Sequence, residues 1–444
     1  MVANGIGGGI ENADTLWVAI VGAGPAGYYT AEALTKDATN VRVDIIDRLP
    51  TPFGLIRAGV APDHQSIKNV SRRYTATNDR ENVRFVGNLM LGRDISMAEL
   101  KELYDVVVLA TGAPHDRALG LEGEDLTGVY GSGAFVGWYN SHPDYTNLSP
   151  DLRIASAAVI GNGNVAVDVA RILAKTAEEM ASTDLAAHAA KEIHGSPIRD
   201  IYILGRRGPL EAAFTPKELS ELNALENCVT LVDAKQLPDA SIDETLTGAP
   251  KKNMAGLRKM VTNQPGDKPV RMHIKFYVRP TKIVGDGTVC CLKLEKTRVE
   301  DGKCIGTGMM ETLPAGLVVP CIGYRSSPIE GVPYDESRGV FVNEEGRIDN
   351  QLYCVGWARR GPTGTIGTNK PDGVGIAAKI LAEVEPSGKA GREGLERIAT
   401  ERDLHIVTFA DWKKIDAAEM AAAEGNAPRA KFSDVDDMVT VAES

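Results

Sequence analysis

The sequence predicts an α/β protein in which one domain is inserted into another. Two segments carry this prediction: LWVAIVGAGPAGYYTAEALTK near the start and SAAVIGNGNVAVDVARILAK near residue 156. Both follow one plan, an apolar strand, a glycine turn and a helix, which is the typical start of a βαβ unit. A chain of 444 residues is also too long for one ordinary core. We therefore expect two Rossmann-like dinucleotide-binding domains, the first built from residues 1–114 and 330–444 and the second from residues 115–329.

Two buried strands mark the expected crossings between these domains. The run YDVVVLATGAP (104–114) is a predicted exit from the first domain, and AGLVVPCIGYRSSP (315–328) is its counterpart at the end of the second. The chain then returns through a strand, a glycine-rich loop and a helix. Residues 232–270 are polar and rich in Pro, Gly and Lys, so we expect a surface excursion there. The last 45 residues are expected to form helix followed by a loose acidic tail.

The first glycine turn has the spacing of a dinucleotide site. Gly22, Gly24 and Gly27 follow an apolar strand as GxGxxG. In this motif the first glycine permits the turn, the second admits a pyrophosphate and the third lets helix and strand pack closely. The next strand, VRVDIID, ends at Asp47, where an acid is expected to bind a ribose hydroxyl. A plain surface carboxylate is the alternative reading of Asp47.

The second glycine turn has a different ending. Gly161, Gly163 and Ala166 form a GxGxxA variant, and after a long helical insert the next strand ends in Arg206 and Arg207. An acid there suits the 2′-hydroxyl of NAD, whereas guanidinium groups suit the 2′-phosphate of NADP. A solvated arginine pair is the alternative. The sequence thus favours NADP(H) as the coenzyme of this domain.

Composition excludes several other classes of protein. The net charge of −11 argues against a nucleic-acid binder, and no apolar run is long enough to span a membrane. The N-terminal stretch has neither the pattern of a secretory signal nor the arginines of a mitochondrial presequence, so we expect a short flexible tail. The six cysteines form no CxxC pair, which indicates reduced cysteines in a cytoplasmic protein without a redox-active disulfide. No metal site is predicted.

Long and particular segments give the chain a family resemblance. These are VAIVGAGPAGYYTAEAL, DRLPTPFGLIRAGVAPDHQSIKNV, GNGNVAVDVARIL, GRRGPLEAAFTPKEL and GWARRGPTGTIGTNKPDG. The sequence resembles the adrenodoxin reductase type of ferredoxin–NADP⁺ reductase, as a bacterial member, over nearly its whole length. The resemblance implies FAD in the first domain and NADPH in the inserted one. It also implies hydride transfer from NADPH to FAD, and then transfer of single electrons to a ferredoxin-type iron–sulfur protein.

The resemblance also implies roles for individual residues by position. Besides the glycines of the first turn, the implied FAD contacts are Ala26, Asp47, Leu55, Leu91, Trp357, Gly364, Thr365 and Ile366. The implied NADP contacts are Asn162, Gly163, Asn164, Val165, Arg206, Arg207 and Glu218, and Gly364 also matches a residue facing the nicotinamide. His64 and Asp168 match a pair of residues near the flavin. That pair is implicated in proton handling or in the electron path to the acceptor. Two departures are Asp47, where animal members carry Glu, and Asn162, where Gln is usual.

The loop GWARRGPTGTIGTNKPDG also makes physical sense without the family. Its glycines expose backbone N–H groups, and the helix expected after Pro371 and Asp372 directs its positive end at whatever the loop holds. Such a helix end would stabilise the negative charge of a reduced flavin. An ordinary glycine-rich connection is the alternative. For His64 and Asp168 the alternatives are an incidental loop histidine and a helix-surface carboxylate.

An acidic ferredoxin needs a basic landing area on this acidic protein. The best candidate is the stretch with Lys251, Lys252, Arg258 and Lys259, although charged runs are usually only solvated surface.

Three other functions are open to a chain of this plan. An electron-input subunit like that of glutamate synthase needs N-terminal cysteine clusters, but the first 200 residues contain no cysteine. A disulfide reductase is disfavoured by the missing cysteine pair. A nucleotide-binding scaffold without turnover is disfavoured by the intact glycines, the arginine pair and the glycine-rich loop.

Overall fold

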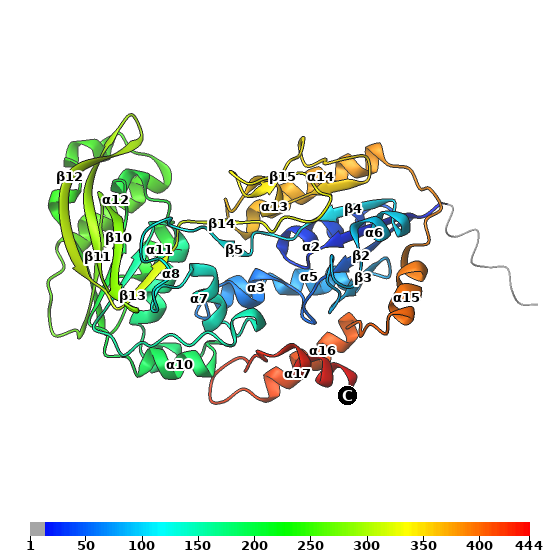
Figure 1. The fold of residues 1–444 in the computed structure, drawn as a ribbon, viewed down its shortest axis with the longest axis horizontal. Helices are drawn as coiled ribbons and strands as arrows, with labels where there is room; N and C mark the ends of the chain where they lie inside the picture. Colours follow the sequence, from blue (N-terminus) through cyan, green and yellow to red (C-terminus); the bar gives the residue numbers. More distant parts are fainter. Residues whose placement is uncertain (1–13) are drawn as a thin grey trace, which may run out of the picture.

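Two α/β domains lie end to end in the computed structural model (Figure 1), which describes residues 14–444. The expected N-terminal tail falls on residues 1–13, outside the described range. The first domain combines the start and the end of the chain, and the second holds the middle of the chain (Figure 1). The predicted α/β fold with an inserted dinucleotide-binding domain is confirmed. Its residue boundaries remain a prediction.

The first domain contains a sheet of five parallel strands. Their order across the sheet is β17 (Leu352–Cys354), β4 (Val106–Leu109), β1 (Leu16–Val21), β2 (Val41–Ile46) and β3 (Val83–Val86). Its longer helices are α2 (Pro25–Leu34), α5 (Ser71–Asn78), α6 (Met97–Leu103), α14 (Asn369–Glu383), α15 (Gly391–Glu401), α16 (Phe409–Ala421) and α17 (Val435–Glu443). Short turns of helix are α3 (Leu55–Ala58), α4 (Gln65–Lys68), α13 (Trp357–Arg360) and η5 (Ile366–Thr368). A two-stranded ribbon, β15 (Tyr334–Asp335) with β16 (Val340–Phe341), completes it.

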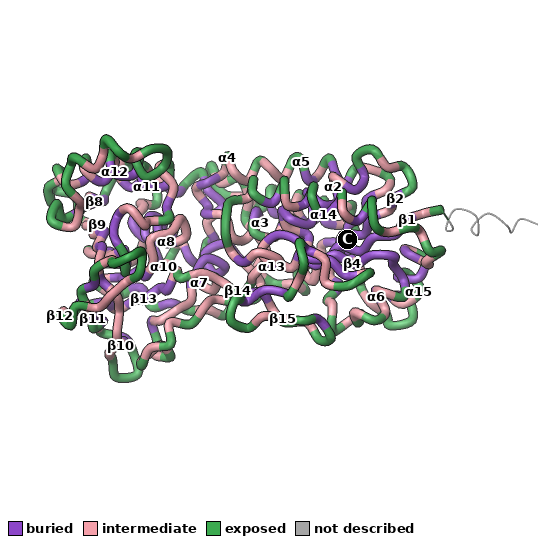
Figure 2. The backbone as a smooth tube through the Cα atoms, turned by 90° about the horizontal axis from the view of Figure 1, so that it is seen from above, coloured by how far each residue is buried: buried purple, intermediate pink, exposed green. Residues whose placement is uncertain are grey.

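This sheet is apolar on both faces because helices cover both. Val18 and Ile20 pack on one side with residues of α2, α5 and α14, while Ala19 and Val21 pack on the other with α6 and α15. All six residues of β1 are buried, as expected of a central parallel strand. Figure 2 shows this buried layer running through the domain.

The second domain repeats the five-stranded parallel arrangement. Its strands lie in the order β13 (Leu317–Pro320), β6 (Ser156–Ile160), β7 (Asp200–Leu204), β9 (Val270–Lys275) and β8 (Cys228–Val232). Its helices are α7 (Ser132–Tyr139), α8 (Asn164–Ala174), α9 (Ala177–Met180), α10 (Ala187–His194), α11 (Pro216–Glu221) and α12 (Gly248–Val261). Short 3₁₀ turns are η1 (Pro143–Tyr145), η2 (Pro209–Glu211), η3 (Ala234–Gln236) and η4 (Ala240–Glu244). The glycine turn after β6 therefore lies where strand order reverses, next to β13.

Three antiparallel strands cover the other face of the second sheet. We call them the meander: β10 (Val278–Asp286), β11 (Thr288–Glu300) and β12 (Lys303–Pro314). Leu292 and Leu294 of β11 pack against Ala158, Ile160 and Leu204 of the sheet. The meander thus replaces the helices that cover this face in the first domain.

The two crossings between the domains pair with each other. β5 (His115–Asp116) and β14 (Tyr324–Arg325) form a short antiparallel ribbon. They follow the two strands predicted as domain exits, so both crossings run side by side.

Two sequence-based expectations were wrong. Residues 232–270 are not only a surface excursion, because α12 buries Met254, Leu257 and Met260 in the core of the second domain. Their spacing of three residues was the helical signal that the polar composition obscured. The end of the chain is not a loose tail either, because Asp434 caps α17 and Met438 packs into the first core.

No helix in the described part of the chain combines the length and apolar character needed to cross a membrane.

Candidate dinucleotide sites and the junction between them

Two of the three glycines in the first turn have no room for a side chain, and the remaining one faces open space. A Cβ on Gly22, whose φ is 116°, would lie 2.4 Å from the carbonyl oxygen of Ala110. A Cβ on Gly27 would lie 2.1 Å from the carbonyl oxygen of Gly22, whereas nothing lies within 4 Å of that position at Gly24. Helix α2 begins directly after Gly24. Only the middle glycine faces open space at a helix N-terminus, which is the geometry that lets a pyrophosphate reach the backbone.

Asp47 folds back onto this turn from the end of β2. Its carboxylate accepts N–H groups from Ala23 at 2.8 Å and Leu49 at 3.0 Å. Burial raises the pKa of Asp47, while these backbone hydrogen bonds act in the opposite direction. The side chain is therefore a fixed part of the turn and not a free surface carboxylate.

The glycine-rich return loop lies against the same turn. A Cβ on Gly356, whose φ is 70°, would lie 2.6 Å from the methyl group of Ala26. Asp372 accepts the Gly356 N–H at 2.6 Å and pairs with Arg359 and Arg360. The strand end, α13 and α14 are thus tied together. Helix α14 begins at Asn369, earlier than expected, because proline is tolerated in a first helical turn.

The other residues predicted in this region differ in exposure. Leu55 in α3 is 46% exposed, and half-buried Leu91 packs against the core. The Trp357 indole donates to the carbonyl of Thr363 and stacks on Tyr324, with ring centres 6.0 Å apart. In the loop that follows, Gly364 has a φ of 80°, the Thr365 N–H donates to the Thr368 hydroxyl, and Ile366 starts η5. Tyr324 gave no signal in the sequence as a neighbour of this loop.

The second glycine turn reproduces the first. A Cβ on Gly161, whose φ is 139°, would lie 2.4 Å from the carbonyl oxygen of Cys321. Gly163 again has nothing within 4 Å, and Ala166 is fully buried where the first turn has its third glycine. The two turns therefore present the same open position to a ligand.

Three residues of the second turn hold its surroundings in place. The Asn162 carbonyl accepts the N–H of Phe214 at 3.0 Å, and the Asn164 side chain accepts that of Thr215 at 2.8 Å. Val165 packs against the core of the domain. These contacts position the start of α11.

The arginine pair follows β7 with both side chains exposed. No carboxylate of the described residues forms an ion pair with Arg206 or Arg207. Their backbone is well held, since the Arg206 carbonyl accepts the hydroxyl of Thr297 at 2.8 Å. Two free guanidinium groups on a fixed turn suit an anionic group such as a phosphate.

A buried arginine joins the two domains. Arg171 of α8 is 1% exposed and pairs with Asp63 and Asp168, each at 2.8 Å. It also lies 3.2 Å from both Glu218 and Glu221 of α11. Arg171 was not among the predicted site residues, although its position three residues after Asp168 on one helix places both on the same face.

His64 of the first domain enters this cluster. Its Nε2 lies 2.9 Å from Glu221 and 3.0 Å from the Arg171 guanidinium, and its Nδ1 lies 4.0 Å from Asp168. The structure thus brings the predicted pair together and adds Glu218 to it, 3.5 Å from His64. This group of His64, Asp168, Glu218, Glu221, Asp63 and Arg171 is called the junction cluster below.

Burial and neighbouring charges shift the pKa values of three residues in the junction cluster. Burial alone would lower the pKa of His64, but the bond to Glu221 and the nearby carboxylates raise it. Burial raises the pKa of Asp168, against the attraction of Arg171. Burial also disfavours ionised Asp63, yet hydrogen bonds from Arg171 and Lys175 hold its pKa well below the usual range. Asp63 therefore stays ionised, whereas Asp168 is more readily protonated than an ordinary carboxyl group.

The same cluster contains a possible metal-ligand set. Ligand atoms of His64, Asp168 and Glu218 lie within 4.8 Å of one another. The Arg171 guanidinium, however, is within 3.2 Å of all three. A metal ion there would face a permanent positive charge, so the guanidinium already supplies the cation that these ligands need.

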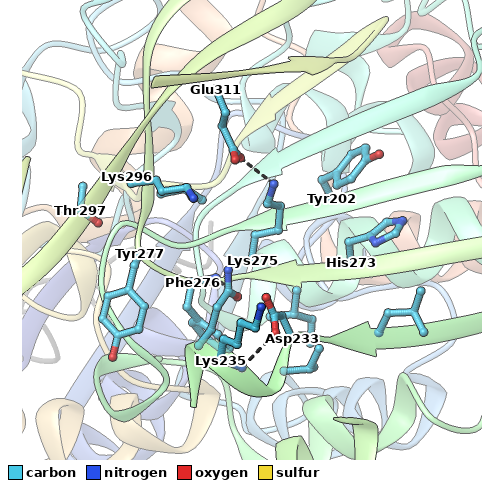
Figure 3. Close-up of a pocket in the computed structure, with 15 residues that line it drawn as sticks. Tyr202, Asp233, Lys235, His273, Lys275, Phe276, Tyr277, Lys296, Thr297 and Glu311 are labelled. Carbon is cyan, nitrogen blue, oxygen red and sulfur yellow. Dashed lines mark hydrogen bonds and ion pairs between the residues drawn. The ribbon is translucent and has the colours of Figure 1, made fainter. Parts of the chain in front are cut away.

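A cavity of about 620 Å³ opens elsewhere, between the second sheet and the meander (Figure 3). None of the predicted site residues lines it. The cavity is therefore separate from the glycine turns and the junction cluster.

Comparison with known proteins gives the family. A family model described as pyridine nucleotide-disulphide oxidoreductase matches residues 17–208. Mitochondrial NADPH:adrenodoxin oxidoreductase of Arabidopsis thaliana is 41% identical over 96% of this chain and 95% of that protein. NADPH-ferredoxin reductase FprA of Mycobacterium leprae (strain TN) is also 41% identical, over 96% of this chain and 98% of that protein. Mycobacterium tuberculosis FprA in complex with NADPH superposes with a TM-score of 0.93 at 39% identity, over 97% of this chain and 100% of that chain. The chain therefore belongs to the family of NADPH:adrenodoxin oxidoreductases and NADPH–ferredoxin reductases.

Proposed function

We propose that this protein is an NADPH–ferredoxin reductase, which takes electrons from NADPH through FAD and delivers them singly to an iron–sulfur protein. One observation carries the proposal. The two glycine turns have the same open middle position, but the residues after the next strand differ. Asp47 follows that strand in the first domain, and Arg206 and Arg207 follow it in the second. An acid suits a ribose hydroxyl and a guanidinium pair suits a 2′-phosphate.

The first domain would hold FAD. Gly24 admits the pyrophosphate, Asp47 binds a ribose hydroxyl, and the N-termini of α2 and α14 favour negative charge. The proposed contacts are Gly22, Gly24, Ala26, Gly27, Asp47, Leu55, Leu91, Trp357, Gly364, Thr365 and Ile366. Bound FAD supplies a ring that accepts a hydride and releases electrons one at a time.

The second domain would hold NADPH as a substrate. Arg206 and Arg207 bind the 2′-phosphate, and Gly163 admits the pyrophosphate. The remaining proposed contacts are Asn162, Asn164, Val165, Glu218 and Gly364. Because Gly364 belongs to the return loop of the first domain, the nicotinamide would reach across the domain boundary.

The junction cluster would hold a proton beside the reacting rings. His64 and Asp168 share the negative surroundings of Glu218 and Glu221, and Arg171 keeps them in place. Hydride transfer itself needs geometry and no acid or base. We therefore assign to His64 and Asp168 control of protonation and coenzyme orientation, and no obligatory role in NADPH oxidation.

The alternative within the matched superfamily is disulfide reduction. All six cysteines are unpaired, and burial raises the pKa of Cys228 and Cys354 to about 12. Such thiols are poor nucleophiles. Cys290 and Cys291 have sulfur atoms 3.8 Å apart but lie on the meander, away from the first glycine turn. Ferredoxin reduction fits these facts better.

Docking of the iron–sulfur protein is proposed on α12. Lys251, Lys252 and Lys259 are exposed, as an acidic partner requires. Arg258 is a weaker candidate because Asp243 already pairs with it at 2.5 Å. The protein would act in the cytoplasm, with a small iron–sulfur protein as partner.

Anaerobic titration of the purified protein with NADPH tests the proposal. We expect a yellow protein whose absorbance is bleached by NADPH far more readily than by NADH. Adding an oxidised ferredoxin should restore the colour. A colourless protein that cannot take up FAD, or one bleached equally by both coenzymes, would contradict it.

A further inference from the structure

We propose that Thr297 of the meander is a positioning residue for coenzyme specificity, because it fixes the turn that carries Arg206 and Arg207. The inference rests on the proposed use of NADPH. It goes beyond the arginine pair in assigning part of the preference for a 2′-phosphate to a residue on a different strand.

The turn is held through its backbone and not through its side chains. The Arg206 carbonyl accepts the Thr297 hydroxyl at 2.8 Å and the Cys304 thiol at 3.1 Å. The Arg207 carbonyl accepts the N–H of Tyr277 at 3.2 Å. These contacts use only backbone atoms of the two arginines, and both side chains are exposed without a carboxylate partner among the described residues.

A strand irregularity aims Thr297 at this turn. The pairing of β11 with β12 shifts register between Glu295 and Thr297. Bulges of this kind turn a side chain away from its regular direction and recur beside functional sites. Thr297 is only 6% exposed, and its N–H donates to the Tyr277 carbonyl at 2.8 Å. Its hydroxyl is thus committed to the turn.

Tyr277, in the connection between β9 and β10, supports the same turn. Its φ of 56° is unusual for a residue with a side chain, and such a conformation persists only where its surroundings enforce it. A Cβ on Gly208 would lie 2.2 Å from the Tyr277 hydroxyl oxygen, so the ring fills the space next to the turn. Figure 3 shows Tyr277 and Thr297 together at one end of the cavity, with Tyr202 and His273 at the other.

Holding the backbone matters because arginine side chains are long and flexible. A turn whose backbone is fixed before the coenzyme arrives removes the backbone ordering that binding would otherwise have to impose. An NADH molecule lacks the 2′-phosphate and gains little from this arrangement. Loosening the turn should therefore weaken NADPH selectively.

The test uses the flavin-loaded full chain with a small dye as acceptor, so that no ferredoxin is needed. Thr297→Val should raise KM for NADPH about fivefold, the effect of one lost hydrogen bond, while leaving kcat and the NADH kinetics nearly unchanged. Thr297→Ser keeps the hydroxyl and should restore the wild-type KM. Thr281→Val is the matched control, since the Thr281 hydroxyl donates to the Lys293 carbonyl on the same meander, away from the turn.

Binding of 2′,5′-ADP and 5′-AMP gives a readout independent of turnover. Thr297→Val should weaken the binding of 2′,5′-ADP and leave the binding of 5′-AMP unchanged. Equal losses for both ligands, or a Thr297→Ser variant as poor as Thr297→Val, would show a merely structural role and overturn the proposal. A wild-type protein without preference for NADPH would instead defeat the proposed function, and with it the basis of this inference.

Discussion

The two glycine turns share a geometry and differ in how the strand after each one ends. In both, the first glycine abuts a neighbouring strand end and the second faces open space. Asp47 then folds back onto its own turn and accepts two of its neighbours' N–H groups. Arg206 and Arg207 point outward without carboxylate partners among the described residues, and only their backbone is anchored. The first turn is suited to a resident cofactor, and the second to a substrate that enters and leaves.

The support of each turn differs as well. Asp47 is anchored by residues near the first turn, so that site is nearly complete within one βαβ unit. The arginine turn depends on Thr297, which is 91 residues away in the chain. Two turns of similar geometry are therefore held in place in different ways, one by nearby residues and the other by a distant strand.

The largest effects should come from filling the closed glycine positions. Gly22→Ala and Gly161→Ala each place a methyl group 2.4 Å from a backbone carbonyl at a positive φ, which costs on the order of 3 kcal/mol or more. We expect Gly22→Ala to lose FAD. Gly161→Ala should keep FAD but lose reduction by NADPH. Flavin absorbance per protein after gel filtration, followed by NADPH titration, measures both.

Gly266→Ala is the control for these variants, because its nearest neighbouring atom is 4.0 Å away. Loss of FAD from both turn variants alike would remove the distinction between a cofactor turn and a substrate turn.

A second effect concerns the ends of the strands. Replacing both Arg206 and Arg207 by Ala should weaken the binding of NADPH at least about tenfold, or about 1.4 kcal/mol, and should affect the binding of NADH much less. Steady-state KM values with a small dye give the answer. Equal losses for the two coenzymes would mean that the pair does not recognise the 2′-phosphate.

A third effect tests the junction between the turns. The pKa of His64 is raised, so its stabilising contribution is complete below the ordinary pKa of about 6.5 and fades as pH rises through the folded-state pKa. His64→Gln should therefore lower Tm by about 2–4 °C at acidic pH, with a smaller difference at alkaline pH. Dye reduction by NADPH should change little.

His142 offers a control of opposite sign. Burial lowers the pKa of His142 to about 4, so protonating the unfolded chain destabilises the fold between pH 6.5 and 4. Removing His142 should thus be least harmful at acidic pH. The same pH trend in both variants would rule out the His64–Glu221 contact as the cause.

The smallest effect should come from the surface of the second domain. Neutralising Lys251, Lys252 and Lys259 to Gln should slow ferredoxin reduction about three- to tenfold at low salt, and the difference should vanish at high salt. Dye reduction reports any general damage. Arg258→Gln removes a charge already paired with Asp243 and should have less effect than Lys252→Gln. An unchanged ferredoxin rate in the triple variant would place docking elsewhere.

Local sequence determined both glycine turns, the strands leading into them and the residues that close them. These features depend on spacing within one βαβ unit, where neighbours in the chain are also neighbours in space. Composition was a poorer guide, because the buried face of α12 and the capped helix α17 lie within polar segments.

The contacts between the domains and around the arginine pair arise instead from tertiary packing. Arg171 meets Asp63 across 108 residues, and His64 meets Glu221 across 157. Thr297 reaches Arg206 only because the meander packs on the second sheet and its strand pairing shifts next to that residue. Such contacts depend on how whole elements pack, and no local periodicity encodes them. Local sequence therefore predicts the two glycine turns and the residues that follow them, whereas the packing of whole elements determines which contacts hold those turns and join the domains.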